Sequence, residues 1–388
     1  MLKAFAGCCD RSPHFLVGSK RKAKGLPDDS NTEVLFPSIA SFKAHPQNVN
    51  CLVAFKPRSI DVEKDEKKLK EDSAEQFDDI ALKDLPTCEI SLKNGLRDSS
   101  LGSEGEGVLL ASCSDTIKLF NSSDFSPVAT LDNGHERDIK CIAVSEEQSL
   151  LFSGSRDCAL CIWRVRGKES SLHYKLANIH ELIITSVDFN NATSQLLSGS
   201  RDSTIKLVDV ESQSVAQQFQ KISRNLVTCL CWVPQSLHNF VQTSEDKQVY
   251  VWDVRQLEPA LVFPRKNWIQ TSCDVSPNGQ LCVSSSNGFD NEGCEVSCWD
   301  LKAAKIITEF KSHAQTVHRC KFMPDSNSYF VTVSNDSTVN KWDMSQSARP
   351  IDTKRPPTYS GLISLAISRG SLRVYTGAVS GDVYAMKF

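Results

Sequence analysis

The chain has 388 residues, of which 40% are hydrophobic and 23% are charged, and its formal net charge at pH 7 is −3. This composition is typical of a globular protein, and the lack of a basic excess argues against nucleic acid as a partner. No apolar run approaches the roughly 18 residues of a membrane-spanning helix, and the fifteen scattered cysteines indicate reduced thiols in an intracellular protein rather than a disulfide framework.

The first 35 residues are expected to form a flexible tail. Cys8 and Cys9 lie shortly before a basic cluster at residues 20–24, KRKAK. An acylated cysteine pair with a basic cluster would supply the two signals that stable membrane attachment needs, and the same cluster could be a nuclear signal. We favour a third alternative, an unmodified tail, so membrane contact is expected only if the tail is lipidated. Leu2 argues against N-myristoylation, which requires glycine there.

From residue 36 onward the sequence predicts short β-strands in seven similar units. Each unit has an apolar run, a turn of small residues that usually includes Asp, and a second apolar run that ends in an aromatic residue or its replacement. A repeat of about 40–45 residues with this ending indicates WD repeats, each of which forms a four-stranded propeller blade. We therefore predict an all-β fold, a seven-bladed WD-repeat β-propeller over residues 36–388. The units end at Phe120, Trp163, Val208, Trp252, Trp299, Trp342 and Met386, at spacings of 43, 45, 44, 47, 43 and 44 residues.

Recurrent His, Asp and Trp residues in these units are expected to be structural. The Asp in each turn can accept a hydrogen bond from the His of its unit, and that His can in turn hold the indole N–H of the Trp. Losing one member of such a buried network costs about 1–3 kcal/mol. Val208 and Phe120 lack a donor, and the fourth and fifth units lack the His. The predicted network comprises His135, Asp157, Trp163, His180, Asp202, Asp246, Trp252, His313, Asp336 and Trp342.

Residues 37–43 are predicted to close the ring. The seventh unit supplies three strands before Phe388, and FPSIASFKAH (36–45) fits an outer strand followed by the His of a first unit. Pairing of this strand with the last blade would remove an exposed sheet edge.

Two segments depart from the repeat. Residues 57–107 form a charged, apolar-poor insertion in the first unit, and this composition predicts a disordered surface loop. The fifth turn, SNGFDNEGCE (286–295), carries acidic residues and Cys294 but has neither EF-hand spacing nor a zinc-ligand pair. We expect a lengthened hairpin tip that is available for contact, with no metal and no cofactor.

Several segments resemble the WD repeat-containing protein thirty-one family of ciliary propellers, most closely over residues 196–300. The resemblance implies a non-enzymatic protein that supports cilium assembly and the regulation of intraflagellar transport. It also implies ciliary trafficking proteins as partners and a cytoplasmic location at the cilium or the ciliary base. The long insertion and Leu2 depart from this family. The segments are SRNLVTCLCWVPQ (223–235), QTSEDK (242–247), IQTSCDVS (269–276) and SNGFDNEGCE (286–295).

No catalytic arrangement is recognisable, so the sequence predicts a binding scaffold rather than an enzyme, with no sign of a homo-oligomer. The residue before each turn Asp should lie at the rim of one face, which makes Arg156, Arg201, Glu245 and Asn335 candidate partner-binding residues. The two arginines could bind partner carboxylates together. Trp268, ahead of an inner strand, is a candidate aromatic anchor. Each of these residues also has an ordinary structural explanation within the repeat.

The alternative function comes from another class of protein. Trp252-Asp253-Val254-Arg255 resembles the adaptor-docking motif of substrate receptors in cullin-type ubiquitin ligases, with Arg255 as the charged contact. The motif is short and arises by chance after a repeat, so we prefer the ciliary scaffold.

Overall fold

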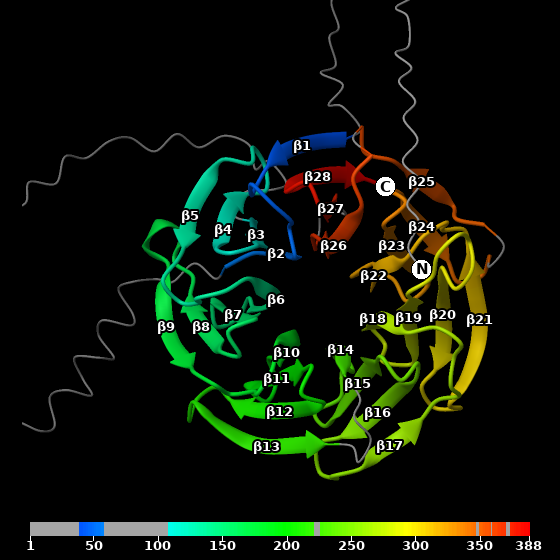
Figure 1. Ribbon diagram of the computed structural model, residues 1–388, viewed down its shortest axis with the longest axis horizontal. Helices are drawn as coiled ribbons and strands as arrows, with labels where there is room; N and C mark the ends of the chain where they lie inside the picture. Colours follow the sequence, from blue (N-terminus) through cyan, green and yellow to red (C-terminus); the bar gives the residue numbers. More distant parts are fainter. Residues whose placement is uncertain (1–38, 58–107, 221–225, 347–348, 358, 370–372) are drawn as a thin grey trace, which may run out of the picture. The chain divides into compact units, whose positions relative to one another are not determined.

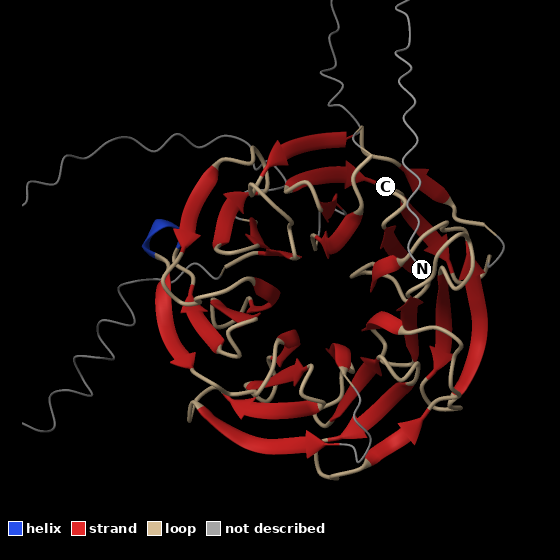
Figure 2. Ribbon diagram, in the orientation of Figure 1, coloured by secondary structure: helices blue, strands red, loops and turns tan. Residues whose placement is uncertain are grey.

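The structure, a computed structural model, describes residues 39–57, 108–220, 226–346, 349–357, 359–369 and 373–388. These residues form seven four-stranded antiparallel sheets arranged in a ring (Figures 1 and 2), with one short 3₁₀ turn, η1 (Gly167–Glu169). The predicted all-β, seven-bladed WD-repeat propeller is therefore confirmed. The expected tail with Cys8 and Cys9, and residues 58–107 of the expected insertion, lie outside the described residues.

Each blade runs from an innermost strand at the ring axis to an outermost strand at its edge. The innermost strands are β2 (Cys51–Phe55), β6 (Ile139–Ser145), β10 (Ile184–Asn190), β14 (Val227–Trp232), β18 (Gln270–Val275), β22 (Val317–Phe322) and β26 (Leu362–Ile367). The second strands are β3 (Leu109–Cys113), β7 (Leu150–Ser155), β11 (Gln195–Ser200), β15 (Asn239–Ser244), β19 (Leu281–Ser286), β23 (Tyr329–Ser334) and β27 (Arg373–Ala378).

The remaining strands complete each blade outward. The third strands are β4 (Ile117–Asn121), β8 (Leu160–Arg164), β12 (Thr204–Asp209), β16 (Val249–Asp253), β20 (Glu295–Asp300), β24 (Val339–Asp343) and β28 (Asp382–Lys387). The outermost strands are β5 (Pro127–Leu131), β9 (Ser171–Leu176), β13 (Ser214–Gln220), β17 (Pro259–Val262), β21 (Lys305–Lys311), β25 (Asp352–Lys354) and β1 (Ile39–Lys43).

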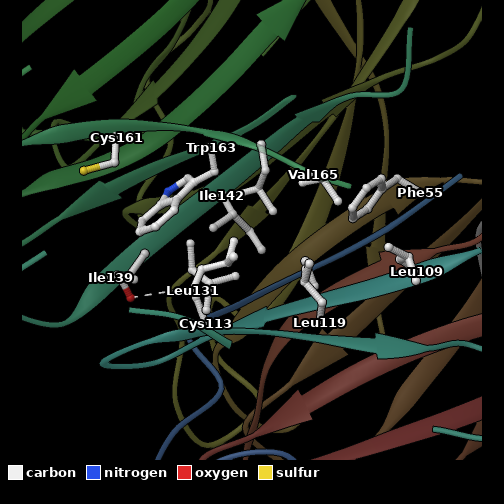
Figure 3. Packing of buried hydrophobic residues seen from close by; sticks show 13 residues of the cluster. Phe55, Leu109, Cys113, Leu119, Leu131, Ile139, Ile142, Cys161, Trp163 and Val165 are labelled. Carbon is white, nitrogen blue, oxygen red and sulfur yellow. Dashed lines mark hydrogen bonds between the residues drawn. The ribbon is translucent and has the colours of Figure 1, made fainter. Parts of the chain in front are cut away.

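The core lies between neighbouring blades. Second and third strands are covered on both faces, so apolar and small residues are buried along them without alternation; all residues of β7, LLFSGS, are buried, for example. Figure 3 shows the cluster between the first two blades, where Trp163 from β8 joins a cluster with Leu119 and Leu131 of the preceding blade. Each blade is thus stabilised by its neighbours, which is why no single repeat folds alone.

The ring is closed by the N-terminal strand, as predicted. β1 pairs antiparallel with β28, from Ile39 opposite Met386 to Lys43 opposite Asp382. Phe42 on β1 also contacts Phe120 of the first blade, with ring centroids 4.7 Å apart. One short strand therefore completes the last blade and joins it to the first.

Candidate protein-interaction face

The residues singled out from the sequence gather mostly at one end of the ring. Because the strands of a blade are antiparallel, the hairpins between second and third strands lie at the same end as the connections that lead into the inner strands. We call this end the hairpin face. It carries the turn Asp residues, the residues that precede them, and the His residues of the repeats.

In the second blade a hydroxyl group joins the predicted network. His135 Nδ1 lies 3.0 Å from Asp157 Oδ2, and His135 Nε2 lies 2.7 Å from Ser153 Oγ. The Trp163 indole N–H donates to the same Ser153 Oγ at 2.8 Å. The Ser153 hydroxyl therefore accepts from the indole and donates to Nε2, which assigns the His135 proton to Nδ1. The expected direct His–indole hydrogen bond is wrong, because the hydroxyl lies between the two rings.

The third and sixth blades repeat this arrangement with their own hydroxyl groups. In the third blade the indole position is taken by the buried, apolar Val208, so that network ends at the hydroxyl. The distances are 2.9 Å for His180 to Asp202, 2.9 Å for His180 to Ser198, 3.1 Å for His313 to Asp336, 2.7 Å for His313 to Thr332 and 2.9 Å for Trp342 to Thr332.

The turn Asp residues also shape the hairpins. Asp157 Oδ1 accepts the N–H of Ala159 at 2.9 Å, across Cys158, whose φ of 65° is left-handed. Burial alone would raise the pKa of Asp157, but hydrogen bonds from His135 and from the N–H groups of Glu136 and Ala159 hold it well below its usual range. The pKa values of Asp202 and Asp336 are lowered in the same way, against burial.

The fourth and fifth blades replace the missing His with amide groups. The Trp252 indole N–H donates to Gln242 Oε1 at 2.7 Å, while Asp246 accepts from the Tyr250 hydroxyl. In the fifth blade, Ser284 Oγ accepts the Trp299 indole N–H at 2.8 Å and donates to Gln270 Oε1 at 2.7 Å. The sequence signal for these substitutes was a Gln within a strand, at the position of the bridging hydroxyl on β15 in the fourth blade and at the start of the inner strand β18 in the fifth.

The first blade has an incomplete network. His45 Nε2 lies 3.0 Å from Ser112 Oγ, but His45 Nδ1 is buried without a partner. The hairpin in this blade is shorter, so Asp115 bonds the adjacent N–H of Thr116 and does not reach the His. Burial, followed by the nearby Lys118 charge, lowers the pKa of His45 to about 4.

The four predicted rim residues lie on the hairpin face but do not form one patch. Arg156 pairs with Asp138 of its own blade at 3.6 Å, whereas Arg201 pairs with Glu245 of the next blade at 3.5 Å. The exposed Asn335 donates to Gln315 Oε1 at 2.9 Å on the sixth blade. Both arginines are therefore already matched with carboxylates of this chain. Of the four candidate residues, Arg201 and Glu245 are the two that contact each other.

The fifth hairpin, residues 287–294, has a rigid tip. Phe289 and Glu292 exchange two backbone hydrogen bonds of 2.9 and 3.0 Å around Asp290 and Asn291, whose φ values of 50° and 67° are both left-handed, as in a type I′ turn. Asn291 N–H donates to Ala314 of the next blade at 3.0 Å. The Phe289 side chain, which the sequence analysis did not single out, is 65% exposed. Its exposure could have been inferred from the sequence, because Phe289 directly precedes Asp290-Asn291, a pair typical of a hairpin turn.

The Trp268 ring packs against this tip at Gly293. The third φ-positive residue of the hairpin, Gly293 (φ 69°), lies so close to the Trp268 ring that a Cβ there would be 2.3 Å from it. Trp268 also lines a hollow of about 760 Å³, which we call the blade-five hollow. Its other lining residues are Arg265, Lys266, Asn267, Asn291, Glu292, Gly293, Cys294, Glu295, Glu309, Lys311, Ser312 and His313.

Charged residues in the blade-five hollow compensate one another. Lys266 pairs with Glu295 at 2.8 Å and with Glu309, and Lys311 pairs with the same two carboxylates at 3.3 and 3.2 Å. Such a closed group of two cations and two anions offers hydrogen-bond partners on both sides of the hollow without a net charge. It favours a polar peptide contact over a strongly charged ligand.

A second hollow of about 430 Å³, the channel mouth, lies on the ring axis and is lined by all seven blades. In six blades the pairing of the two inner strands skips one residue, and a β-bulge of this kind redirects the skipped side chain. Arg201 and Glu245 line the same hollow, so it lies at the hairpin-face end of the axis. The skipped residues, all in the lining, are Lys140, Thr185, Thr228, Thr271, His318 and Ile363.

Arg255 lies at the opposite face, in the turn after β16. Its guanidinium makes a bidentate contact with Asp253, with 2.9 Å from Nε to Oδ1 and 2.5 Å from Nη2 to Oδ2. The Arg255 side chain is 65% exposed. It is therefore held in one orientation while remaining accessible.

No metal centre is found within the described ranges, since no group of three or more His, Cys, Asp or Glu side chains there could hold an ion. The twelve described cysteines are free thiols. None of the described segments forms a helix long and apolar enough to cross a membrane.

Four segments match the family model described as WD domain, G-beta repeat: residues 125–164, 174–209, 217–253 and 304–343. The chain is 26% identical over 238 residues to nuclear distribution protein PAC1 of Komagataella phaffii, covering 55% of this chain and 46% of that protein. It is 27% identical over 219 residues to eukaryotic translation initiation factor 3 subunit I of Nematostella vectensis, covering 54% and 64%. It is 24% identical over 279 residues to a guanine nucleotide-binding protein subunit beta of Zea mays, covering 68% and 72%. The chain thus spans about half to two thirds of the length of the first two of these relatives.

Proposed function

We propose that this WD-repeat propeller is a non-enzymatic scaffold that binds other proteins through the tip of its fifth hairpin. We further propose that it acts in the cytoplasm at the cilium or its base, in cilium assembly and the regulation of intraflagellar transport. The family resemblance of residues 196–300 supports the ciliary part. Two of the similar proteins are subunits by name, which supports the scaffold part.

The observation that carries the proposal is the exposed Phe289 on a rigid tip. An aromatic side chain held in one place loses little conformational freedom on binding, and aromatic residues dominate the energetics of many interfaces. Backbone hydrogen bonds and Trp268 hold the tip, and the blade-five hollow beside it can receive a partner's side chain. The proposed contact is therefore centred on Phe289.

Affinity purification from ciliated cells tests this proposal. The variant Phe289→Ser is compared with Leu257→Ser, because Leu257 is 67% exposed on the opposite face and the two changes remove similar exposed apolar area. We expect ciliary transport proteins to co-purify with the wild type and with Leu257→Ser but not with Phe289→Ser. Equal recovery by both variants would place the contact elsewhere, and recovery of no ciliary protein by the wild type would contradict the ciliary role.

A ubiquitin-ligase receptor is the second proposal, and the accessible, oriented Arg255 guanidinium supports it. The same purification with Arg255→Ala tests it directly. Loss of a cullin adaptor from the Arg255→Ala sample, with the Phe289→Ser sample unaffected, would favour this function over the ciliary one.

A further inference from the structure

Among the residues that the structure describes, one cation of the channel mouth has no carboxylate partner. Of its three lysine and arginine side chains, Lys140 pairs with Asp138 at 3.5 Å and Arg201 pairs with Glu245 at 3.5 Å. Arg319 on β22 has no hydrogen-bond or ion-pair partner among the residues that the structure describes. A partly buried guanidinium without a partner is costly, so such groups usually meet an anion.

The position of Arg319 on the ring axis is shown by its neighbours. It lies within electrostatic reach of the sulfurs of Cys51, Cys141 and Cys229, which belong to three other blades. The Cys141 thiol is neutral, since burial raises its pKa well above its usual range, whereas the hydrogen bond with Cys273 and, against burial, the Arg319 charge lower the pKa of Cys229 well below its usual range. His318, beside Arg319, is neutral too, because burial and then the Arg319 charge lower its pKa to about 4.

The carboxylates deeper in the channel are already engaged. Asp188 Oδ2 accepts the N–H of Trp232 at 2.7 Å, and Asp274 Oδ2 accepts the N–H of Phe322 at 2.7 Å. Both feel the charge of Lys321, two residues beyond Arg319 on the same strand. Among the described residues, these carboxylates thus act on Lys321, and no carboxylate forms an ion pair with Arg319.

The residues that line the channel mouth indicate which class of anion would pair with Arg319. Ile183, Ile269 and Ile363 contribute aliphatic surface around the basic group. A free phosphate ion gains nothing from aliphatic surface, whereas a glutamate side chain brings both a methylene stem and a carboxylate that fits a guanidinium in bidentate fashion. The volume of about 430 Å³ is also in the range of sites that enclose organic ligands rather than single ions.

We infer that the channel mouth is a binding site for an acidic side chain of a partner protein, with Arg319 as the residue that recognises its carboxylate. This inference rests on the proposed scaffold function, but it concerns a place separate from the fifth hairpin tip. The Thr185, Thr228 and Thr271 hydroxyls donate to carbonyl groups of neighbouring blades at 2.5–2.7 Å, so the inner ring around the site is fixed before binding.

The test uses the full chain and an acetylated hexaglutamate peptide, with hexaglutamine and inorganic phosphate as comparison ligands at constant ionic strength. Binding is measured by calorimetry for the wild type, Arg319→Gln and Arg156→Gln. Arg156→Gln is the matched control, because it removes the same charge from the hairpin face outside the hollow. We expect hexaglutamate to bind the wild type and Arg156→Gln, and to bind Arg319→Gln about tenfold or more weakly, since a charged hydrogen-bond partner is lost.

A melting curve without ligand accompanies this experiment. Arg319→Gln should melt at or above the wild-type temperature, because it removes an unpaired charge; a lower temperature would mean that the protein itself satisfies Arg319 and would overturn the inference. Equal hexaglutamate affinity of Arg319→Gln and wild type would overturn it as well, as would phosphate binding without hexaglutamate binding. Phe289→Ser should keep the hexaglutamate affinity of the wild type, so failure of the tip proposal and failure of this one give different results.

Discussion

At the scale of single residues, one small hydroxyl decides whether two large polar side chains are satisfied. Ser153 lies between His135 and Trp163, and Ser284 holds Trp299 in the fifth blade, where Gln270 takes the place of the His. The His, Asp and Trp letters of the repeat are conspicuous in the sequence, whereas a Ser in a strand is not. The bridging group was therefore the part of the network that the sequence analysis missed.

Ser153→Ala should lower the free energy of unfolding by about 1–3 kcal/mol, because it leaves the Trp163 indole N–H and His135 Nε2 buried without partners. Ser123→Ala is the control, since Ser123 is exposed and its hydroxyl bonds Asn121 alone among the described residues. The two variants are compared by urea unfolding. Equal unfolding midpoints for the two variants would show that water or a rearrangement satisfies His135 and Trp163 in place of the Ser153 hydroxyl.

Asp188 makes the stability of the protein depend on pH. Burial, opposed by the Trp232 N–H and by Lys321, raises the pKa of Asp188 to about 7, and the neighbouring Asp274 is raised to about 6. A carboxyl with a raised folded-state pKa binds its proton more tightly when folded, so the free energy of unfolding falls as pH rises from about 4 to 7. The turn Asp residues, whose pKa values are lowered, act in the opposite direction and only at more acidic pH.

Asp188→Asn removes one of these titrations while keeping an acceptor for the Trp232 N–H. We expect its gain in unfolding free energy over the wild type to be about 1–2 kcal/mol larger at pH 8 than at pH 5. Unfolding by urea at the two pH values measures this difference. Asp352→Asn, which changes an exposed residue of β25, should show no such difference, and a similar result for both variants would contradict the assignment.

At the scale of elements, the fifth hairpin is longer than the corresponding hairpins of the other described blades. Its length was predictable from SNGFDNEGCE. Its rigidity was not, because the contacts with Trp268 and Ala314 come from connections that are distant in the sequence. The ion pairs of the rim arginines were not predictable for the same reason: Asp138 and Glu245 approach Arg156 and Arg201 across loops whose positions no repeat pattern specifies.

Gly293→Ala tests the packing of this hairpin on Trp268. Gly293 and Gly167 both have positive φ, of 69° and 58°, so alanine costs about 1 kcal/mol of backbone strain at either position. Only at position 293 would the new Cβ meet a ring, and overpacking should add about 1–3 kcal/mol. Unfolding free energies and hydrogen exchange of residues 287–294 measure the effect. Equal losses for Gly293→Ala and Gly167→Ala would mean that the tip moves freely away from Trp268.

At the scale of the whole molecule, the repeat determines most of the architecture. The spacing of the units predicted the number of blades, and the apolar segment before His45 predicted the closure. The channel mouth was not predictable, because its lining depends on skipped residues in the pairing of the inner strands. A strand pattern read from sequence assumes regular alternation, and a bulge shifts that alternation by one residue.

Removal of β1 should destabilise the entire ring. A chain that begins at residue 44 leaves β28 with an open edge and loses the Phe42 contact with Phe120, so we expect a lower melting temperature and aggregation. A chain that begins at residue 36 retains β1 and should melt like the full-length protein. An unchanged melting temperature in the shorter chain would show that the seventh blade is stable with three strands.

Closure by β1 also has a consequence for synthesis on the ribosome. β1 is translated before every other described strand, and its partner β28 follows more than 300 residues later. During that interval β1 lacks the strand with which it pairs, although Phe42 can contact Phe120 of the first blade, and long-range pairing of this kind is slow and prone to misassociation. The short, partly polar sequence of β1, IASFK, favours a strand that stays unpaired until β28 has been translated. Completion of the ring therefore joins the first and the last of the described strands.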